Sequence, residues 1–208
     1  SAGAGDTVSN SIAPLTGLTV HSLYEGAEND AASVLEGLDA LIIDLRDVGV
    51  RCYTYAATAA RFASAALAHH IEVIICDRAN PLGPLVEGPR PEPDRKSLLA
   101  YFDVPFVHGR TISELIALSV SPVINQAPFA VYPADVSLQP PLGWIPPSPA
   151  LSHPDAVAAY PGLVLLEATN VSEGRGTSVS FRSVAAPGLD AEALARAVNE
   201  WTTGFGAT

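Results

Sequence analysis

Short apolar runs that end abruptly in polar residues form the main pattern along this chain. Residues 41–43 and 73–76 are such runs, and their length and composition are typical of strands covered on both faces. The segment between them, residues 55–70, is rich in alanine and contains neither Pro nor Gly, which predicts a helix. A strand, a helix and a second strand in this order predict two parallel strands that end at the same edge of an open α/β sheet.

Both predicted strands lead directly into charged and aromatic side chains. The first is followed by Asp44, Arg46, Asp47, Arg51, Tyr53 and Tyr55, and the second by Asp77, Arg78, Asn80, Glu87 and Arg90. Ligands of open α/β sheets bind in the crevice outside the carboxyl ends of the strands. The sequence therefore predicts a ligand site at this edge.

Weaker patterns flank this unit. Residues 18–24 alternate between apolar and polar positions, as an edge strand does, and Asn29 or Asp30 is placed to cap a short helix that stops at Gly37. Residues 79–96 are rich in Pro and Gly, which predicts an ordered loop without regular structure.

The second half of the chain alternates between clear and weak signals. Residues 104–107 are extended in pattern, and Thr111 with Glu114 predicts a capping box at the start of a helix over residues 112–118. Residues 129–132 read as a strand, after which prolines make the pattern irregular.

The C-terminal part is predicted to hold one more strand and one amphipathic helix. The apolar run 163–166 reads as a strand that ends in the polar segment 167–177. Asp190 is placed to cap a helix over residues 191–201, with an apolar side formed by Leu194, Val198 and Trp201.

Composition narrows the classes of protein that fit. The chain has 208 residues, 48% of them hydrophobic, and a mean hydropathy of +0.26, but no run reaches the roughly 18 apolar residues of a membrane span. The net charge of −11, from 22 acidic and 11 basic residues, argues against a nucleic-acid partner. Cys52 and Cys76 lack metal-ligand spacing and are either buried thiols or a disulfide. No G-x-G-x-x-G follows a strand, which argues against a dinucleotide site.

Three predicted strand ends thus supply carboxylates, arginines, tyrosines and a histidine to one polar cleft. Such a set suits an uncharged or anionic sugar, because carboxylates perform acid–base or nucleophilic chemistry, aromatic faces hold the ring, and arginine binds a ligand carboxylate.

Several spaced motifs in this chain resemble those of a known family. They are Asp44 to Tyr55, Asp77 to Pro81, Val86 to Pro89, Val107 to Gly109, Pro147 to Pro149, Tyr160 to Gly162 and Glu167 to Thr177. Together and in this order they resemble the NamZ-type exo-β-N-acetylmuramidases, glycoside hydrolase family 171. Many spaced motifs are far more specific than any single one.

The resemblance implies a fold and a domain organisation. It implies a Rossmann-like, open, mostly parallel sheet with flanking helices over residues 1–140, and a linker with the start of a smaller C-terminal α+β domain over residues 141–208. Members of the family usually carry a Pro-Glu-His-Gly motif, whose Glu is a candidate catalytic acid, before the position of Ser1, and they continue beyond Thr208. The chain is therefore expected to correspond to the central part of such an enzyme.

The resemblance also implies an activity. A protein of this kind removes N-acetylmuramic acid from the non-reducing end of peptidoglycan fragments in bacterial cell-wall recycling, with no cofactor and no metal, and a secreted or periplasmic location is favoured. The lactyl carboxylate of muramic acid would pair with Arg51, Arg78 or Arg175. The chain departs from the usual family residues at five motif positions: Arg46 (usually Gln), Cys52 (Phe), Ala79 (Pro), Ala150 (Asn) and Ala168 (Gly).

The candidate site residues fall into two groups. Glu173 is the acid–base candidate, Asp47 its partner or an orienting group, and His108 a proton carrier or a helix-start residue bonded to backbone. The candidate substrate-binding residues are Asp44, Arg51, Tyr53, Tyr55, Asp77, Arg78, Asn80, Glu87, Asn170 and Arg175.

Structural roles are the alternative for several of these residues. Asp44 and Asp47 also suit a turn with arginine partners, the tyrosines suit packing, and Glu173 with Arg175 suits a turn with an ion pair. Two functions follow: a glycoside hydrolase, or a catalytically weak or inactive muramyl-sugar-binding remnant of that family.

Overall fold

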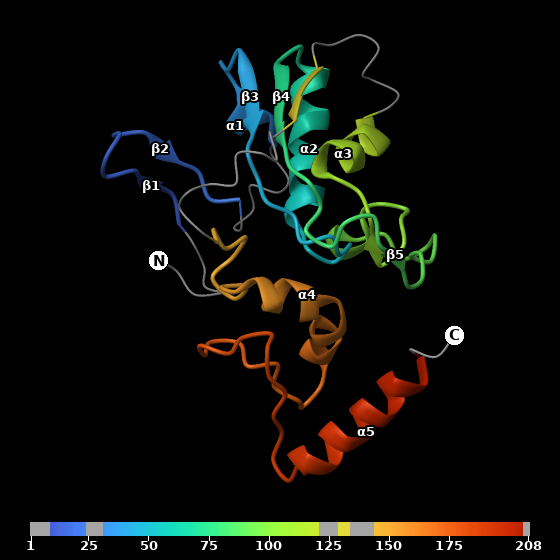
Figure 1. Ribbon diagram of the computed structural model, residues 1–208. Helices are drawn as coiled ribbons and strands as arrows, with labels where there is room; N and C mark the ends of the chain where they lie inside the picture. Colours follow the sequence, from blue (N-terminus) through green and yellow to red (C-terminus); the bar gives the residue numbers. More distant parts are fainter. Residues whose placement is uncertain (1–8, 24–30, 121–128, 134–143, 206–208) are drawn as a thin grey trace.

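A three-stranded parallel sheet is the centre of the fold (Figure 1). Its strands are β3 (Ala40–Ile43), β4 (Glu72–Asp77) and β7 (Phe129–Pro133), in the order β3-β4-β7. Both pairings are parallel, which confirms the predicted strands and the predicted α/β class. The computed structural model describes residues 9–23, 31–120, 129–133 and 144–205.

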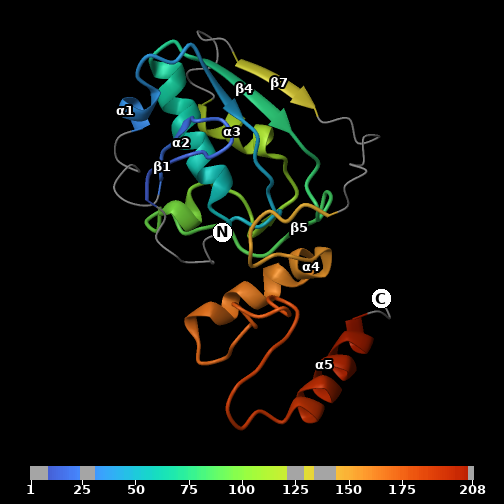
Figure 2. The same ribbon diagram turned by 90° about the vertical axis from the view of Figure 1, so that its left-hand side faces the viewer.

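Three helices accompany this sheet: α1 (Ala31–Leu35), α2 (Tyr55–Ala68) and α3 (Ile112–Val120). α2 and α3 pack side by side against the sheet, and α1 packs against α2 (Figures 1 and 2). Alanine fills most of the buried side of α2, and such small side chains let a helix lie close to strands. All three helices were predicted. The predicted cap of the first, at residues 29–30, lies outside the described residues.

The start of α3 confirms the predicted capping box. The backbone N–H of Thr111 donates to Glu114 Oε2 at 2.9 Å, and the backbone N–H of Glu114 donates to Thr111 Oγ1 at 3.3 Å. These bonds satisfy two backbone donors that a helix start would otherwise leave unpaired.

Short antiparallel strands lie outside the main sheet. β1 (Ser11–Ile12) pairs with β2 (Thr19–Val20), so the edge strand predicted over residues 18–24 belongs to a separate hairpin and is shorter. β5 (Val86–Glu87) pairs with β6 (Val107–His108). The prediction of a wholly irregular loop over 79–96 was therefore wrong at β5.

The strand predicted at residues 163–166 was wrong. These residues form the end of α4 (Pro154–Leu163) and the start of a 3₁₀ helix, η4 (Val164–Ala168). A short apolar run has the same composition in a strand and in a helix, and here Pro154 at the first helical turn starts a helix that the run continues. The polar segment after it is thus reached from a helix.

A second apolar core joins α4 to the loop after β3. Its buried members are Val48, Val50, Tyr53, Ala150, Leu151, Ala156, Val157, Tyr160 and Phe181. Figure 1 shows α4 below the sheet, on the side where β5 lies. The core fixes the C-terminal segment against the carboxyl edge of the sheet, where the site was predicted.

The last helix, α5 (Ala191–Phe205), lies apart from both cores. Asp190 Oδ1 accepts a hydrogen bond from the backbone N–H of Ala193 at 2.9 Å, which confirms the predicted cap. The predicted apolar side is present but uncovered, since Leu194, Val198 and Trp201 are 38%, 51% and 73% exposed. The domain boundary predicted near residue 140 falls between described segments and stays a prediction.

Candidate functional site

Backbone hydrogen bonds hold the loop after β3 against the segment around β6. The N–H of Arg51 donates to the carbonyl of Phe106 at 2.8 Å, and the N–H of His108 donates to the carbonyl of Gly49 at 3.2 Å. Val50 also forms an antiparallel bridge with Val107. Two segments far apart in the sequence are thereby fixed side by side.

This pairing places Asp47 against His108. His108 Nε2 lies 3.3 Å from Asp47 Oδ2, and the two side chains are only 1% and 6% exposed. The backbone N–H of Gly49 donates to the same oxygen at 2.9 Å. Oδ2 is therefore fully engaged, and the carboxylate has one orientation.

The other ring nitrogen of His108 shows which tautomer is present. Nδ1 accepts a hydrogen bond from the backbone N–H of Arg110 at 3.2 Å. An acceptor nitrogen carries no proton, so the ring proton is at Nε2, which lies beside Asp47 Oδ2. Both nitrogens are occupied, which suits a residue that orients Asp47 better than one that carries protons.

Asp47 also lines a small hollow at the edge of the sheet, and its second oxygen is buried. Oδ1 is buried and has no hydrogen-bond partner within the described part of the chain. The hollow has a volume of about 90 Å³ and is lined by Arg46, Asp47, Arg78, Ala79, Pro81, Trp144 and Pro147. A buried carboxylate oxygen without a donor is unfavourable, so this place favours a ligand that carries an O–H or N–H group.

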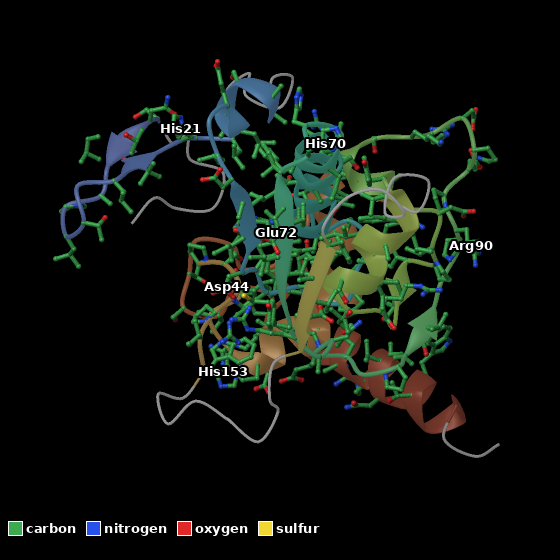
Figure 3. The ribbon with its side chains drawn as sticks, turned by 90° about the horizontal axis from the view of Figure 1, so that it is seen from above. His21, Asp44, His70, Glu72, Arg90 and His153 are labelled. Carbon is green, nitrogen blue, oxygen red and sulfur yellow. The ribbon has the colours of Figure 1, made fainter. Side chains whose placement is uncertain are left out.

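Arg78 reaches this hollow from the end of β4. Its Nη1 lies 2.5 Å from Asp44 Oδ1 and also contacts the carbonyls of Leu45 and Cys76, at 3.3 and 3.4 Å. Asp44 is labelled in Figure 3, just past β3. Arg90, labelled in the same view, lies far from Asp44 and pairs with Asp103 at 3.2 Å. The structure thus brings Asp44 and Arg78 together at the site and leaves Arg90 outside it.

Two other predicted residues at the end of β4 hold the local backbone. Asp77 accepts hydrogen bonds from the backbone N–H and the hydroxyl of Ser113, at 3.0 and 2.7 Å, which ties the strand to the first turn of α3. Asn80 accepts from the N–H of Leu82 at 2.8 Å and donates to the carbonyl of Arg110 at 3.1 Å. Asp77 and Asn80 therefore hold the backbone around the site through hydrogen bonds.

Arg51 is engaged in a similar way. Its Nη1 donates to the carbonyls of Pro89 and Val104, at 3.0 and 2.8 Å, and its guanidinium lies 5.9 Å from the centre of the Phe106 ring. Burial lowers the pKa of Arg51. These contacts fix the loop that carries Glu87, whose own side chain is exposed on β5.

The tyrosines lie between the sheet edge and α4. The Tyr53 hydroxyl donates to the carbonyl of Pro147 at 2.9 Å, and its ring lies 4.6 Å from that of Tyr55 and 6.1 Å from that of Tyr160. Burial raises the pKa of both Tyr53 and Tyr160. Tyr53 is a packing residue that also positions Pro147 in the wall of the hollow.

Glu173 and Arg175 belong to a second polar cluster after η4. Glu173 is 7% exposed, and Arg175 Nε lies 3.1 Å from its Oε1. Arg175 Nη2 pairs with Glu167, and the guanidinium lies 5.1 Å from the centre of the Phe181 ring. Arg175 therefore bridges two carboxylates. Asn170, also predicted to bind substrate, is exposed.

Tyr160 connects the two clusters. Its ring packs edge-on against Phe181 at 5.0 Å, and its hydroxyl interacts with the thiol of Cys52. Cys52 and Cys76 are both free thiols and partly buried, so they form no disulfide.

Sequence reasoning missed four residues of these clusters as site candidates: Arg46, Trp144, Tyr160 and Glu167. Arg46 and Glu167 lie close to predicted site residues in the sequence. Tyr160 reaches the clusters through the second core, and Trp144 lines the hollow.

Within the described ranges, no cluster of three or more His, Cys, Asp or Glu side chains has the arrangement of a metal site. In the same residues no helix is both long and apolar enough to cross a membrane.

The fold and these contacts define an α/β protein with a polar, carboxylate-containing site at the carboxyl edge of a parallel sheet. Family models make the assignment specific. The model described as exo-beta-N-acetylmuramidase NamZ, N-terminal, matches residues 1–155, and its C-terminal counterpart matches residues 158–206. The chain belongs to the NamZ family, which confirms the resemblance seen in the motifs.

Individual relatives agree with this assignment. The chain is 34% identical over 203 residues to the peptidoglycan beta-N-acetylmuramidase NamZ of Bacillus subtilis (strain 168), a match that covers 94% of this chain and 49% of the relative. It is also similar to the crystal structures of two DUF1343 family proteins of Bacteroides fragilis NCTC 9343. The first has a TM-score of 0.76 and 31% identity, covering 92% of this chain and 52% of that one. The second has a TM-score of 0.68 and 33% identity, covering 85% and 50%. The chain thus spans about half the length of the relatives it matches.

Proposed function

We propose that this protein is a glycoside hydrolase that releases N-acetylmuramic acid from the non-reducing ends of peptidoglycan fragments. Membership of the NamZ family supports this, as does the 34% identity to a relative named for that activity. The acidic charge of the chain, −11, is compatible with a small sugar substrate and argues against a polyanion.

One observation carries the proposal: the buried carboxylate of Asp47 is held at Oδ2 by the N–H of Gly49 and by the contact with His108, while its Oδ1 has no hydrogen-bond partner among the described residues. A structural carboxylate would have both oxygens satisfied within the protein. Hydroxyl and acetamido N–H groups of a sugar are donors of the required kind. A hydrogen bond from the sugar to Oδ1 orients the ring, and it accelerates hydrolysis where it is stronger in the transition state.

The proposed roles divide between the two clusters. Asp47 contacts the sugar and His108 positions it, while Trp144 offers an aromatic face in the wall of the hollow. Glu173, with Arg175 at its Oε1, is the proposed acid–base residue that transfers a proton at the glycosidic oxygen. Glycoside hydrolysis commonly uses two carboxylates in this way.

The test uses two disaccharides that differ only in order. The full chain is incubated with MurNAc-β-1,4-GlcNAc and, separately, with GlcNAc-β-1,4-MurNAc, and the products are identified by mass spectrometry. We expect free N-acetylmuramic acid from the first disaccharide only, and loss of that product in Glu173→Gln. Intact disaccharides in both reactions would contradict the hydrolase, and binding of the first without cleavage would favour the sugar-binding alternative.

A further inference from the structure

Phe181 has an unusual backbone conformation for a large, buried residue. Its φ is +52°, which lies in the left-handed region that bulky residues rarely occupy. The other non-glycine residue with a positive φ in the described part of the chain, His70, directly follows the end of α2, where this conformation is common. Phe181 lies in a turn and ends no helix, so its conformation needs a local cause.

Backbone hydrogen bonds close the loop that carries Phe181. Ser172 and Ala185 exchange two of them, at 2.7 and 2.9 Å, and the N–H of Phe181 donates to the carbonyl of Glu173 at 2.8 Å. The strained residue is therefore attached directly to the residue that carries the buried carboxylate of this cluster.

The ring of Phe181 contacts the partner of that carboxylate. The guanidinium carbon of Arg175 lies over the ring, 5.1 Å from its centre, and Arg175 Nε lies 3.1 Å from Glu173 Oε1. A guanidinium is attracted to an aromatic face at this distance. The ring is itself fixed, because Phe181 is 1% exposed and packs against the ring of Tyr160 in the second core.

The ring decides where the guanidinium of Arg175 is held. Glu167, the second carboxylate that pairs with Arg175, is exposed, and an exposed ion pair alone holds a long side chain weakly. The Phe181 ring adds a buried contact on the side of Glu173. It therefore favours the position in which Arg175 Nε donates to Glu173.

We propose that Phe181 is a positioning residue for the reaction: its ring holds Arg175 at Glu173, so that the carboxyl group keeps one orientation toward the glycosidic oxygen. This rests on the proposed function in that Glu173 is the acid–base residue. Phe181 touches no reacting atom and acts only through Arg175 and Glu173. Its unfavourable φ is retained because the same turn places the ring beneath the guanidinium and the N–H on the Glu173 carbonyl.

Three variants separate this role from ordinary packing. Phe181→Leu keeps an apolar side chain and the backbone N–H but removes the aromatic face. Phe181→Tyr restores the face. Phe62→Leu is the matched control, because Phe62 is a buried phenylalanine of α2 that packs in the core around the sheet, so the same packing is lost away from Arg175.

The first readout is the rate at which the Nε proton of Arg175 exchanges with water, measured on the full chain by ¹⁵N NMR. The signal is assigned by its absence in Arg175→Lys. We expect exchange to be about threefold to thirtyfold faster in Phe181→Leu, and to be nearly unchanged in Phe181→Tyr and Phe62→Leu. An unchanged rate in Phe181→Leu, or fast exchange already in the unsubstituted chain, would overturn the proposal.

The second readout is the hydrolysis of MurNAc-β-1,4-GlcNAc by the same proteins. We expect Phe181→Leu to lower kcat by about tenfold to one-hundredfold with little change in KM, Phe181→Tyr to regain most of it, and Phe62→Leu to keep it. A raised KM with an unchanged kcat in Phe181→Leu would overturn the role. Absence of cleavage by every protein would refute the proposed function, while the exchange rates would separately decide whether Phe181 holds Arg175.

Discussion

His108 is predicted to stabilise the protein mainly through Asp47. Replacing it by Ala removes the Nε2–H donor that lies 3.3 Å from Asp47 Oδ2. Oδ1 already lacks a partner among the described residues, so the buried carboxylate would keep only the N–H of Gly49. Gln is the matched variant, because its side-chain amide can place an N–H close to the position of Nε2 while it loses the ring.

The magnitude follows from the burial of the pair. A hydrogen bond to a charged group contributes about 1.5–3 kcal/mol, and the side chains here are 1% and 6% exposed, so solvent cannot replace the lost donor. Removing the imidazole also leaves a cavity, so we expect His108→Ala to lower the free energy of unfolding by about 2–4 kcal/mol. His108→Gln should lose only about 1–2 kcal/mol, since the donor to Asp47 is kept.

Urea unfolding followed by circular dichroism measures both variants, with an unchanged m-value as the check that the same transition is compared. For a chain of this size the loss in His108→Ala corresponds to a decrease in Tm of about 4–16 °C. A His108→Ala variant within about 0.5 kcal/mol of the unsubstituted chain would refute the reasoning. So would a Gln variant as unstable as the Ala variant, because the donor would then contribute nothing.

Three further predictions concern residues around the site. Gly49→Ala should lower the free energy of unfolding, measured in urea, by at least about 1–2 kcal/mol. Gly49 has φ +78°, and an added Cβ would clash with Asn80 Oδ1. An unchanged free energy of unfolding would contradict this. Tyr53→Phe should cost about 1 kcal/mol by the same measurement, since the hydroxyl bonds the carbonyl of Pro147; an unchanged stability would show that water replaces it. Burial raises the pKa of the Cys52 thiol, so less thiolate is present at a given pH. In a Cys76→Ala variant, where Cys52 is the remaining thiol, the reaction with a disulfide reagent should therefore be slower than that of free cysteine and should speed up only at higher pH. Equal rates near pH 8 would refute this.

The sequence predicted the elements whose signals are local. Two apolar runs around an alanine-rich helix gave a correct strand–helix–strand unit, because buried parallel strands and a helix between them leave distinct patterns. The capping box of Thr111 and Glu114 was equally local and was found. The strand predicted over residues 163–166 was wrong, because a run of four apolar residues has no periodicity that distinguishes a strand from a helix.

The site was predicted in position but only partly in detail. That polar residues meet at the carboxyl edge of the sheet follows from parallel strands. The sequence did not predict His108 as the partner of Asp47. Backbone pairing between the loop after β3 and β6 brings the two side chains together, and no sequence pattern near Asp47 indicates that pairing. The place of Arg46 in the lining of the hollow is likewise visible only in the structure.

The most direct test of the account is the rate at which the chain and its Asp47→Asn variant release the chromophore from an aryl β-N-acetylmuramide. Asn keeps an oxygen for His108 and Gly49 but replaces the acceptor at Oδ1 by a donor. We predict turnover by the unsubstituted chain and a decrease in kcat/KM of about 100-fold or more in the variant, with a similar urea midpoint. Equal rates for the two proteins would contradict the claim that Asp47 Oδ1 contacts the reacting sugar.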